Sequence, residues 1–202
     1  KKRYKISFIP NPVDESIDDL KVYENKNPKY DLFFAMSHGV HRGVLKKGKF
    51  DERENIINKL IKNNPNLKFN IFGMANKQPV WGDDFRENLN NSKIALNLSQ
   101  GKPLKYYSSD RIAQLMGNGI ATLIDKKTKI NELFSDDCAI FYNSLEDLNL
   151  KLNKLIKNDK LRNKIAKKGK TKYHKIYNST KIADFIICKT FNIKKKFIWD
   201  KA

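Results

Sequence analysis

The chain has 202 residues, of which 40% are hydrophobic and 31% are charged. A chain of this length can bury roughly 70% of its unfolded surface, so it needs no disulfide or metal to hold a core. Its 41 lysine and arginine residues outnumber its 22 acidic residues, and the net charge of +19 implies anionic partners: nucleic acid, an acidic membrane surface or a phosphorylated substrate. No apolar run approaches the ~20 residues of a membrane span. Cys138 and Cys188 lie in apolar runs typical of buried thiols in a reducing compartment, so we expect a soluble, cytoplasmic protein.

The first thirty residues are predicted to be a linker. Residues 4–9 predict a strand, and Pro10 and Pro12 after it forbid helix and enforce a turn. A strand that runs straight into a proline-rich stretch is typical of an inter-domain linker. The chain also has no initiator methionine. We therefore expect residues 1–30 to be a linker and entry strand from an N-terminal domain that is missing here.

Strands and helices alternate through the middle of the chain. Apolar runs predict strands at 31–36, 67–72, 94–98, 120–124 and 139–142. Apolar residues at helical spacing predict helices at 51–62, 83–91 and about 109–116. This alternation is typical of the α/β class, so we expect a Rossmann-like, mostly parallel sheet flanked by helices over residues 31–143.

Three further helices are predicted after the last strand. Ser144 and Asp147 form a capping box that starts the first of them. Helices at about 159–177 and 180–191 follow, and a basic and aromatic tail ends the chain. We expect residues 144–202 to form a helical extension that packs on the α/β domain.

The stretch from Ile94 to Ile124 is the candidate ligand-binding unit. A crossover between parallel strands aims its helix N-terminus at the edge of the sheet where ligands bind. The loop from Ser99 to Ser109 is longer than the ~2–6 residues that such a connection needs. Its lysines, tyrosines and serines, beside the N–H groups of a helix N-terminus, suit a phosphorylated ligand. From these residues alone, serines that merely cap a helix and tyrosines that pack are an equal alternative.

Motifs for self-contained catalysis or metal binding are missing or incomplete in the sequence. Residues 43–50 nearly spell a Walker A loop, but Phe50 replaces the Ser or Thr that would hold magnesium. His38 and His41 have no third ligand at metal spacing, which does not favour a zinc site. Neither a G-x-S-x-G nor a G-x-G-x-x-G motif is present. We therefore assign no catalytic residue and expect no metal.

Two stretches of the chain are similar to a known family. Residues 8–14 read Phe-Ile-Pro-Asn-Pro-Val-Asp, and residues 111–119 read Arg-Ile-Ala-Gln-Leu-Met-Gly-Asn-Gly. They resemble the entry linker and the R-x-x-E-x-x-x-x-G helix of the C-terminal, donor-binding domain of GT-B glycosyltransferases of the group 1 type. The order of elements matches as well. The resemblance implies one half of a GT-B fold, in a hexosyltransferase-like enzyme that is inactive as this fragment alone.

The resemblance also implies which residues bind the donor, a nucleotide diphosphate sugar. In the family, the loop after the first strand binds the diphosphate, and the helix near Ser109 lies beside the diphosphate and ribose. Gln114 stands at the family's ribose-binding glutamate and Tyr106 at its second glutamate, while Asp110, one turn before Gln114, is able to supply a carboxylate. The donor-binding residues implied here are His38, Gly39, Arg42, Lys47, Gly73, Tyr107, Ser108, Ser109, Asp110, Arg111 and Gln114.

The partners implied by the resemblance are the nucleotide sugar and an N-terminal acceptor domain of the same protein, which would supply the catalytic groups. The acceptor would be a glycan or lipid-linked molecule of bacterial cell-surface polysaccharide or lipopolysaccharide synthesis. The positive charge suits an anionic membrane at its inner face. The competing hypothesis is a basic nucleic-acid-binding module in which Tyr106 and Tyr107 stack on bases. We rank it second because no nucleic-acid motif is present, and a degenerate domain with an empty cleft is a third hypothesis.

Overall fold

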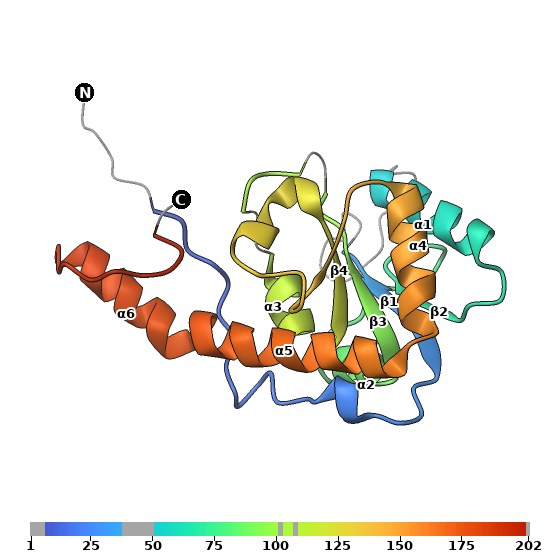
Figure 1. The fold of residues 1–202 in the computed structure, drawn as a ribbon, viewed down its shortest axis with the longest axis horizontal. Helices are drawn as coiled ribbons and strands as arrows, with labels where there is room; N and C mark the ends of the chain where they lie inside the picture. The colour runs from blue at the N-terminus through green and yellow to red at the C-terminus, as the bar shows by residue number, and fades with distance from the viewer. Residues whose placement is uncertain (1–6, 38–50, 101–102, 107–108, 201–202) are drawn as a thin grey trace.

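The described part of the protein is built on one sheet of five parallel strands, as the sequence predicts. The computed structural model describes residues 7–37, 51–100, 103–106 and 109–200. The strands lie in the order β2-β1-β3-β4-β5, and every neighbouring pair is parallel (Figure 1). Their bounds are β1 (Tyr30–Ala35), β2 (Phe69–Phe72), β3 (Ser92–Asn97), β4 (Ala121–Asp125) and β5 (Ile140–Tyr142).

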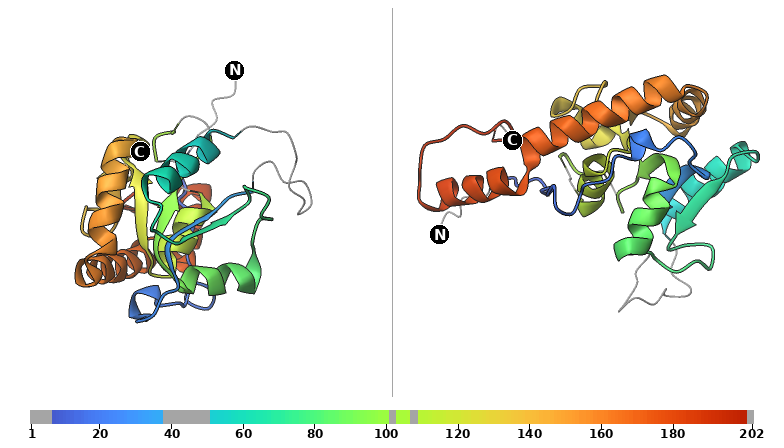
Figure 2. Two further views of the ribbon diagram at one scale, coloured as in Figure 1. Left: turned by 90° about the vertical axis from the view of Figure 1, so that its right-hand side faces the viewer. Right: turned by 90° about the horizontal axis from the view of Figure 1, so that it is seen from below.

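Helices connect the strands and continue after the last one. The described residues form six α-helices: α1 (Glu52–Asn63), α2 (Gly82–Asn90), α3 (Asp110–Gly117), α4 (Leu145–Ile156), α5 (Asp159–Tyr177) and α6 (Ser179–Thr190). The same part of the chain also has short 3-10 helices, η1 (Val22–Glu24), η2 (Lys126–Thr128) and η3 (Ile130–Glu132). α5 packs against α3 and β4, and α6 continues from its end beyond the sheet (Figures 1 and 2).

Both faces of the sheet are buried, which explains why its strands are almost continuously apolar. On one face, Leu32 and Phe34 of β1 pack in a core with α1 and α4. On the other face, Phe33 packs with Leu89 of α2 and Leu115 of α3. Side chains alternate between the two faces along a strand, so β1 contributes to both cores. The sheet is therefore the middle layer of a three-layer α/β domain.

The predicted strand at residues 4–9 is wrong where the structure describes it, because residues 7–9 form no strand. Backbone pairing begins later, at Val13, which forms a parallel bridge with Asn178. The N–H of Val13 donates to the carbonyl of Tyr177 at 3.0 Å, and the N–H of Ser179 donates to the carbonyl of Val13 at 2.9 Å. We call residues 7–19 the entry segment. Its backbone thus pairs with the junction between α5 and α6 rather than with the sheet. The division of the chain at residues 30 and 143 stays a prediction.

Asp14 ties the same entry segment to the start of α6. One carboxylate oxygen accepts a hydrogen bond from the hydroxyl of Ser179 at 2.6 Å, and the other accepts from the hydroxyl and the backbone N–H of Ser16. Hydrogen bonds to a charged carboxylate favour the charged form. These bonds, with that from Ser179 the largest contribution, lower the pKa of Asp14 from 3.8 to about 2.

We expect Asp14 to titrate with a pKa of about 2 in an NMR titration of its side-chain carboxyl. Because the folded pKa lies below the unfolded value, this group stabilises the fold above pH 3.8, and the contribution is lost as the pH falls towards 2. Ser179→Ala should raise the pKa of Asp14 more than the control Ser16→Ala. An Asp14 pKa that does not change in Ser179→Ala would show that the contact between entry segment and α6 is absent in solution.

Candidate functional site

The strand order predicts where a ligand binds. In a parallel sheet of order 2-1-3-4-5, ligands bind beyond the carboxyl ends of the strands where the order reverses, here at β1 and β3. A pocket of about 290 Å³ lies beside the end of β1, between α2 and α3. It is lined by Ile17, Asp18, Ala35, Met36, Ser37, Pro79, Val80, Trp81, Gly82, Phe85, Arg86, Asp110, Arg111, Gln114 and Asn118.

The first turns of α3 bring a carboxylate and an amide to this pocket. Asp110 and Gln114 are four residues apart, both are exposed, and both line the pocket, so the expectation that they face the same side is confirmed. The Asp110 carboxylate accepts a hydrogen bond from the N–H of Arg111 at 2.9 Å. It therefore places negative charge at the N-terminus of α3, which makes this point better suited to hydroxyl groups than to phosphate.

Arg111 holds α3 against the ends of the strands. Its guanidinium donates to the carbonyl of Leu98 at 2.7 Å, directly after β3. The guanidinium carbon also lies 5.6 Å from the centre of the Phe34 ring in β1. Arg111 is thus a positioning residue for Asp110 and Gln114 as well as part of the pocket wall.

The entry segment forms a second wall, which the sequence did not predict. Ile17 and Asp18 line the pocket, and the guanidinium of Arg86 in α2 holds this segment by donating to the Ile17 carbonyl and to Asp19, the latter at 2.5 Å. Asp18 also accepts from the side-chain amide of Asn118 at 3.0 Å. Burial raises the pKa of Asp18 above its usual value.

The loop between β2 and α2 supplies the aromatic part of the pocket. Val80 and Trp81 of this loop and Phe85 of α2 line the pocket, and Trp81 is 55% exposed. No spacing motif marks these residues. The position of Trp81 could have indicated a binding role, because it lies in a loop that follows the carboxyl end of a predicted parallel strand.

The structure brings three of the predicted donor-binding residues, Asp110, Arg111 and Gln114, to the pocket. Ser109 precedes α3, and its carbonyl accepts from the N–H of Ile112. Gly73 follows β2 with a φ of +80°, where an added Cβ would lie 1.7 Å from the carbonyl oxygen of Met36. The binding role of every predicted residue stays a prediction. Six of them lie outside the described residues: His38, Gly39, Arg42, Lys47, Tyr107 and Ser108.

Tyr106, at the position of the family's second glutamate, has contacts outside this pocket. Its hydroxyl donates to the carboxylate of Glu132, its ring centre lies 5.9 Å from that of Phe8, and the ammonium of Lys105 lies 4.6 Å from the ring centre. Its backbone has a φ of +57° and its N–H donates to Thr128. Of Tyr106 and Asp110, the residue that lines the pocket is therefore Asp110.

The described part of the chain holds no group of three or more His, Cys, Asp or Glu side chains able to bind a metal ion. Metal independence stays a prediction. Cys138 and Cys188 are buried and free, as expected, and burial raises the pKa of both thiols. Within the described ranges, every helix is too short or too polar to cross a membrane.

Known proteins share this fold and part of this sequence. The model of a family described as glycosyl transferase-like matches residues 52–187. The crystal structure of TarM superposes with a TM-score of 0.57 and 12% identity, covering 89% of this chain and 36% of that chain. Sucrose-phosphate synthase from Thermosynechococcus elongatus superposes with a TM-score of 0.50 and 10% identity, covering 71% of this chain and 35% of that one. No curated protein sequence matches. The chain thus spans about a third of each of these two structures.

We expect Gly73→Ala to destabilise the fold more than Gly82→Ala, a matched control. Both glycines have a positive φ, and an alanine at such a position typically costs about 1 kcal/mol or more in free energy of unfolding. An added Cβ at Gly82 meets no atom within 4 Å among the described residues, whereas at Gly73 it meets the Met36 carbonyl. Urea unfolding of both variants measures the difference. Equal losses would contradict the close approach of the β1 and β2 ends.

Proposed function

The chain belongs to the glycosyl transferase-like family and has the fold of one half of a GT-B glycosyltransferase, and from this we propose that its pocket binds a nucleotide diphosphate sugar as glycosyl donor. The observation that carries the proposal is the exposed pair of Asp110 and Gln114 on α3, in one pocket with Trp81 at the edge where the strand order reverses. Hydroxyl-binding groups and a flat aromatic surface are the two features that a nucleoside needs.

The ribose is the part of the donor that we assign to α3. A carboxylate accepts hydrogen bonds from hydroxyl groups, and a glutamine amide both accepts and donates, so Asp110 and Gln114 together suit two neighbouring hydroxyls. The negative charge of Asp110 disfavours phosphate at the same point. We therefore assign the diphosphate to the segment that follows Ser37, where His38, Gly39, Arg42 and Lys47 stand in the sequence.

The base is the part that we assign to Trp81. Its indole is 55% exposed and lines the pocket, and stacking of a base on an aromatic side chain typically contributes ~1–3 kcal/mol. Stacking discriminates little between bases, because every base has a flat π-face. The identity of the base would therefore depend on polar groups around the ring, and not on Trp81.

The remaining assignments concern the whole enzyme. We infer that the acceptor, a glycan or lipid-linked molecule of cell-surface polysaccharide or lipopolysaccharide type, binds to an N-terminal domain of the same protein. That domain would also supply the catalytic groups, so this chain would bind the donor without transferring a hexosyl group. The support for this division is the coverage of about a third of each related structure. Basic side chains would neutralise the leaving diphosphate, so no metal is required.

Calorimetric titration of the purified chain with UDP, GDP, ADP and CMP tests the proposal. One of these nucleotides should bind saturably. Trp81→Ala should weaken that binding about tenfold or more, because a stacking surface is lost. Gln114→Ala should weaken it about three- to tenfold, the loss expected for neutral hydrogen bonds.

The control is Asn63→Ala, an exposed side-chain amide at the last residue of α1 that is not part of the pocket. It should bind nucleotide as the unmodified chain does. Saturable binding that neither Trp81→Ala nor Gln114→Ala weakens would place the nucleotide elsewhere. Salt-sensitive binding of a single-stranded oligonucleotide, with no nucleotide preference, would make the nucleic-acid hypothesis the better one.

A further inference from the structure

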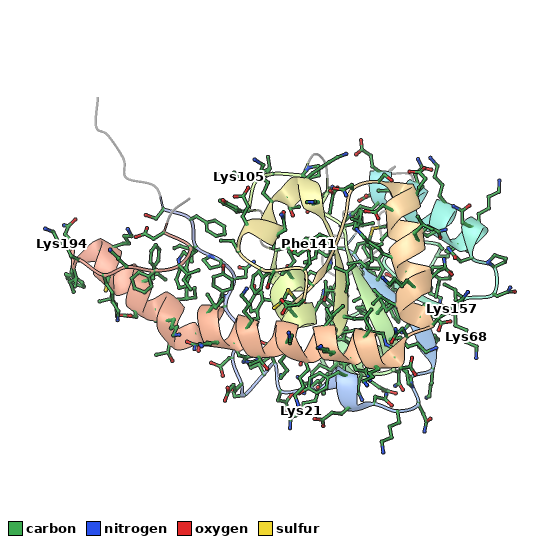
Figure 3. All side chains as sticks on the ribbon, in the orientation of Figure 1. Lys21, Lys68, Lys105, Phe141, Lys157 and Lys194 are labelled. Atoms are coloured by element: carbon green, nitrogen blue, oxygen red, sulfur yellow. The ribbon has the colours of Figure 1, made fainter. Side chains whose placement is uncertain are left out.

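A second pocket lies between α5 and the segment that leads to β1. It encloses about 580 Å³, a volume in the range of small-molecule sites. η1 packs against α5 here, and Lys21 lies beside α5 at the lower side of the view (Figures 1 and 3). Asp18 belongs both to this second pocket and to the pocket beside α3. The second pocket is lined by Glu15, Asp18, Asp19, Lys21, Tyr23, Lys170, Thr171, His174 and Lys175.

Four of the lining residues are held by contacts within the chain. The ammonium of Lys170 donates to the carbonyls of Asp18 and Gly117, both at 2.6 Å. Nε2 of His174 lies 2.9 Å from the same Gly117 oxygen. The carboxylates of Asp18 and Asp19 take part in the hydrogen bond to α3 and the ion pair with α2 described above. A ligand would not have to order these groups, so this part of the wall is preorganised.

Five further lining side chains have no partner within the described residues. Those of Glu15, Lys21, Thr171 and Lys175 are exposed, and that of Tyr23 is half-buried. In the part of the chain that the structure describes, none of these five side chains forms a hydrogen bond or an ion pair. The pocket therefore offers a ligand one carboxylate, two ammonium groups and two hydroxyl groups.

The backbone brings these groups together around one space. Thr171 and Lys175 are four residues apart on α5, so they share a face of the helix. The N–H of Tyr23 donates to the carbonyl of Gly119 at 3.2 Å. A Cβ added to Gly119 would lie 2.8 Å from Cδ1 of Tyr23 and 3.3 Å from Cδ of Lys170. The glycine thus allows the tyrosine ring to approach α5 closely.

The charges that line the second pocket nearly cancel, because three lysines face three acidic residues beside one histidine. A strongly charged ligand of either sign would meet side chains of its own sign, which is unfavourable. A carboxylate only accepts hydrogen bonds and an ammonium only donates them, whereas a hydroxyl group does both. One ligand hydroxyl can therefore donate to a carboxylate and accept from an ammonium at the same time. This lining fits a neutral ligand that is rich in hydroxyl groups.

We propose that the second pocket binds a saccharide through its hydroxyl groups. Glu15 accepts hydrogen bonds from them, Lys21 and Lys175 donate to their oxygen atoms, and Thr171 does both. The ring of Tyr23 adds an apolar surface with a polar hydroxyl at its tip. The saccharide is a free sugar or one unit of a glycan chain, since both carry the same hydroxyl groups. The proposal does not depend on the donor site.

An NMR titration of the isotope-labelled chain with glucose, galactose, mannose and N-acetylglucosamine tests the proposal. At least one sugar should shift the backbone N–H signals of Tyr23, Thr171 and Lys175 together. The expected dissociation constant is about millimolar, as a few hydrogen bonds of ordinary net strength would give. Tighter binding of an oligosaccharide of the same sugar would assign the pocket to a glycan chain, and equal binding would assign it to a single sugar.

Variants of the lining side chains locate the saccharide. Glu15→Gln and Lys175→Gln should each weaken binding about tenfold, the loss expected for a hydrogen bond to a charged group. Thr171→Val should weaken it about three- to tenfold, because a neutral hydrogen bond is lost. Lys167→Gln is the matched control for Lys175→Gln, since Lys167 is exposed on α5 outside the pocket. It should bind the sugar as the unmodified chain does.

Several results would overturn the proposal. One is the absence of shifts with all four sugars, and another is sugar binding that neither Glu15→Gln nor Lys175→Gln weakens. Shifts confined to Trp81 and Asp110 would place the sugar beside α3 instead. Inorganic phosphate that shifts the signals of the second pocket, where no sugar does, would make it an anion site. Nucleotide titration follows the pocket beside α3, so failure of one proposal is distinguishable from failure of the other.

Discussion

The fixed position of α3 is the constraint on which the candidate site depends. At its start, Arg111 joins the helix to the carbonyl after β3. At its end, the carbonyl of Gly117 accepts from the ammonium of Lys170 at 2.6 Å and lies 2.9 Å from Nε2 of His174, both on α5. A helix held at both ends presents Asp110 and Gln114 in one arrangement, so a ligand would not have to order them on binding.

Lys170, which holds the end of α3, also joins the entry segment to the pocket. Lys170 also donates to the carbonyl of Asp18 at 2.6 Å, and burial lowers its pKa below the usual value. Arg86 holds the neighbouring residues of that segment from the other side of the pocket. The entry segment, α3 and α5 therefore meet at one point. A movement of the entry segment would reach the pocket wall directly, which gives a physical route by which the proposed N-terminal domain could act on the proposed donor site.

The sequence predicted the sheet and the pair on α3 because both depend on local periodicity. Apolar runs mark the buried strands, and residues four apart on a helix share a face whatever surrounds them. The rest depends on contacts between distant segments. The sequence of residues 7–9 predicts a strand, yet backbone pairing of the entry segment occurs at Val13, with the distant residue Asn178. Trp81 and Ile17 become pocket residues only because α2, α3 and the entry segment converge, and no local pattern encodes that convergence.

The central claim is that a nucleoside occupies the pocket beside α3, and an NMR titration of the isotope-labelled chain with UDP, GDP, ADP and CMP tests it most directly. The account predicts that one nucleotide shifts the indole N–H of Trp81, the side-chain amide of Gln114 and the backbone N–H of Asp110 together, with a common dissociation constant. Shifts confined to residues of α5 or α6, with these three signals unchanged, would contradict it.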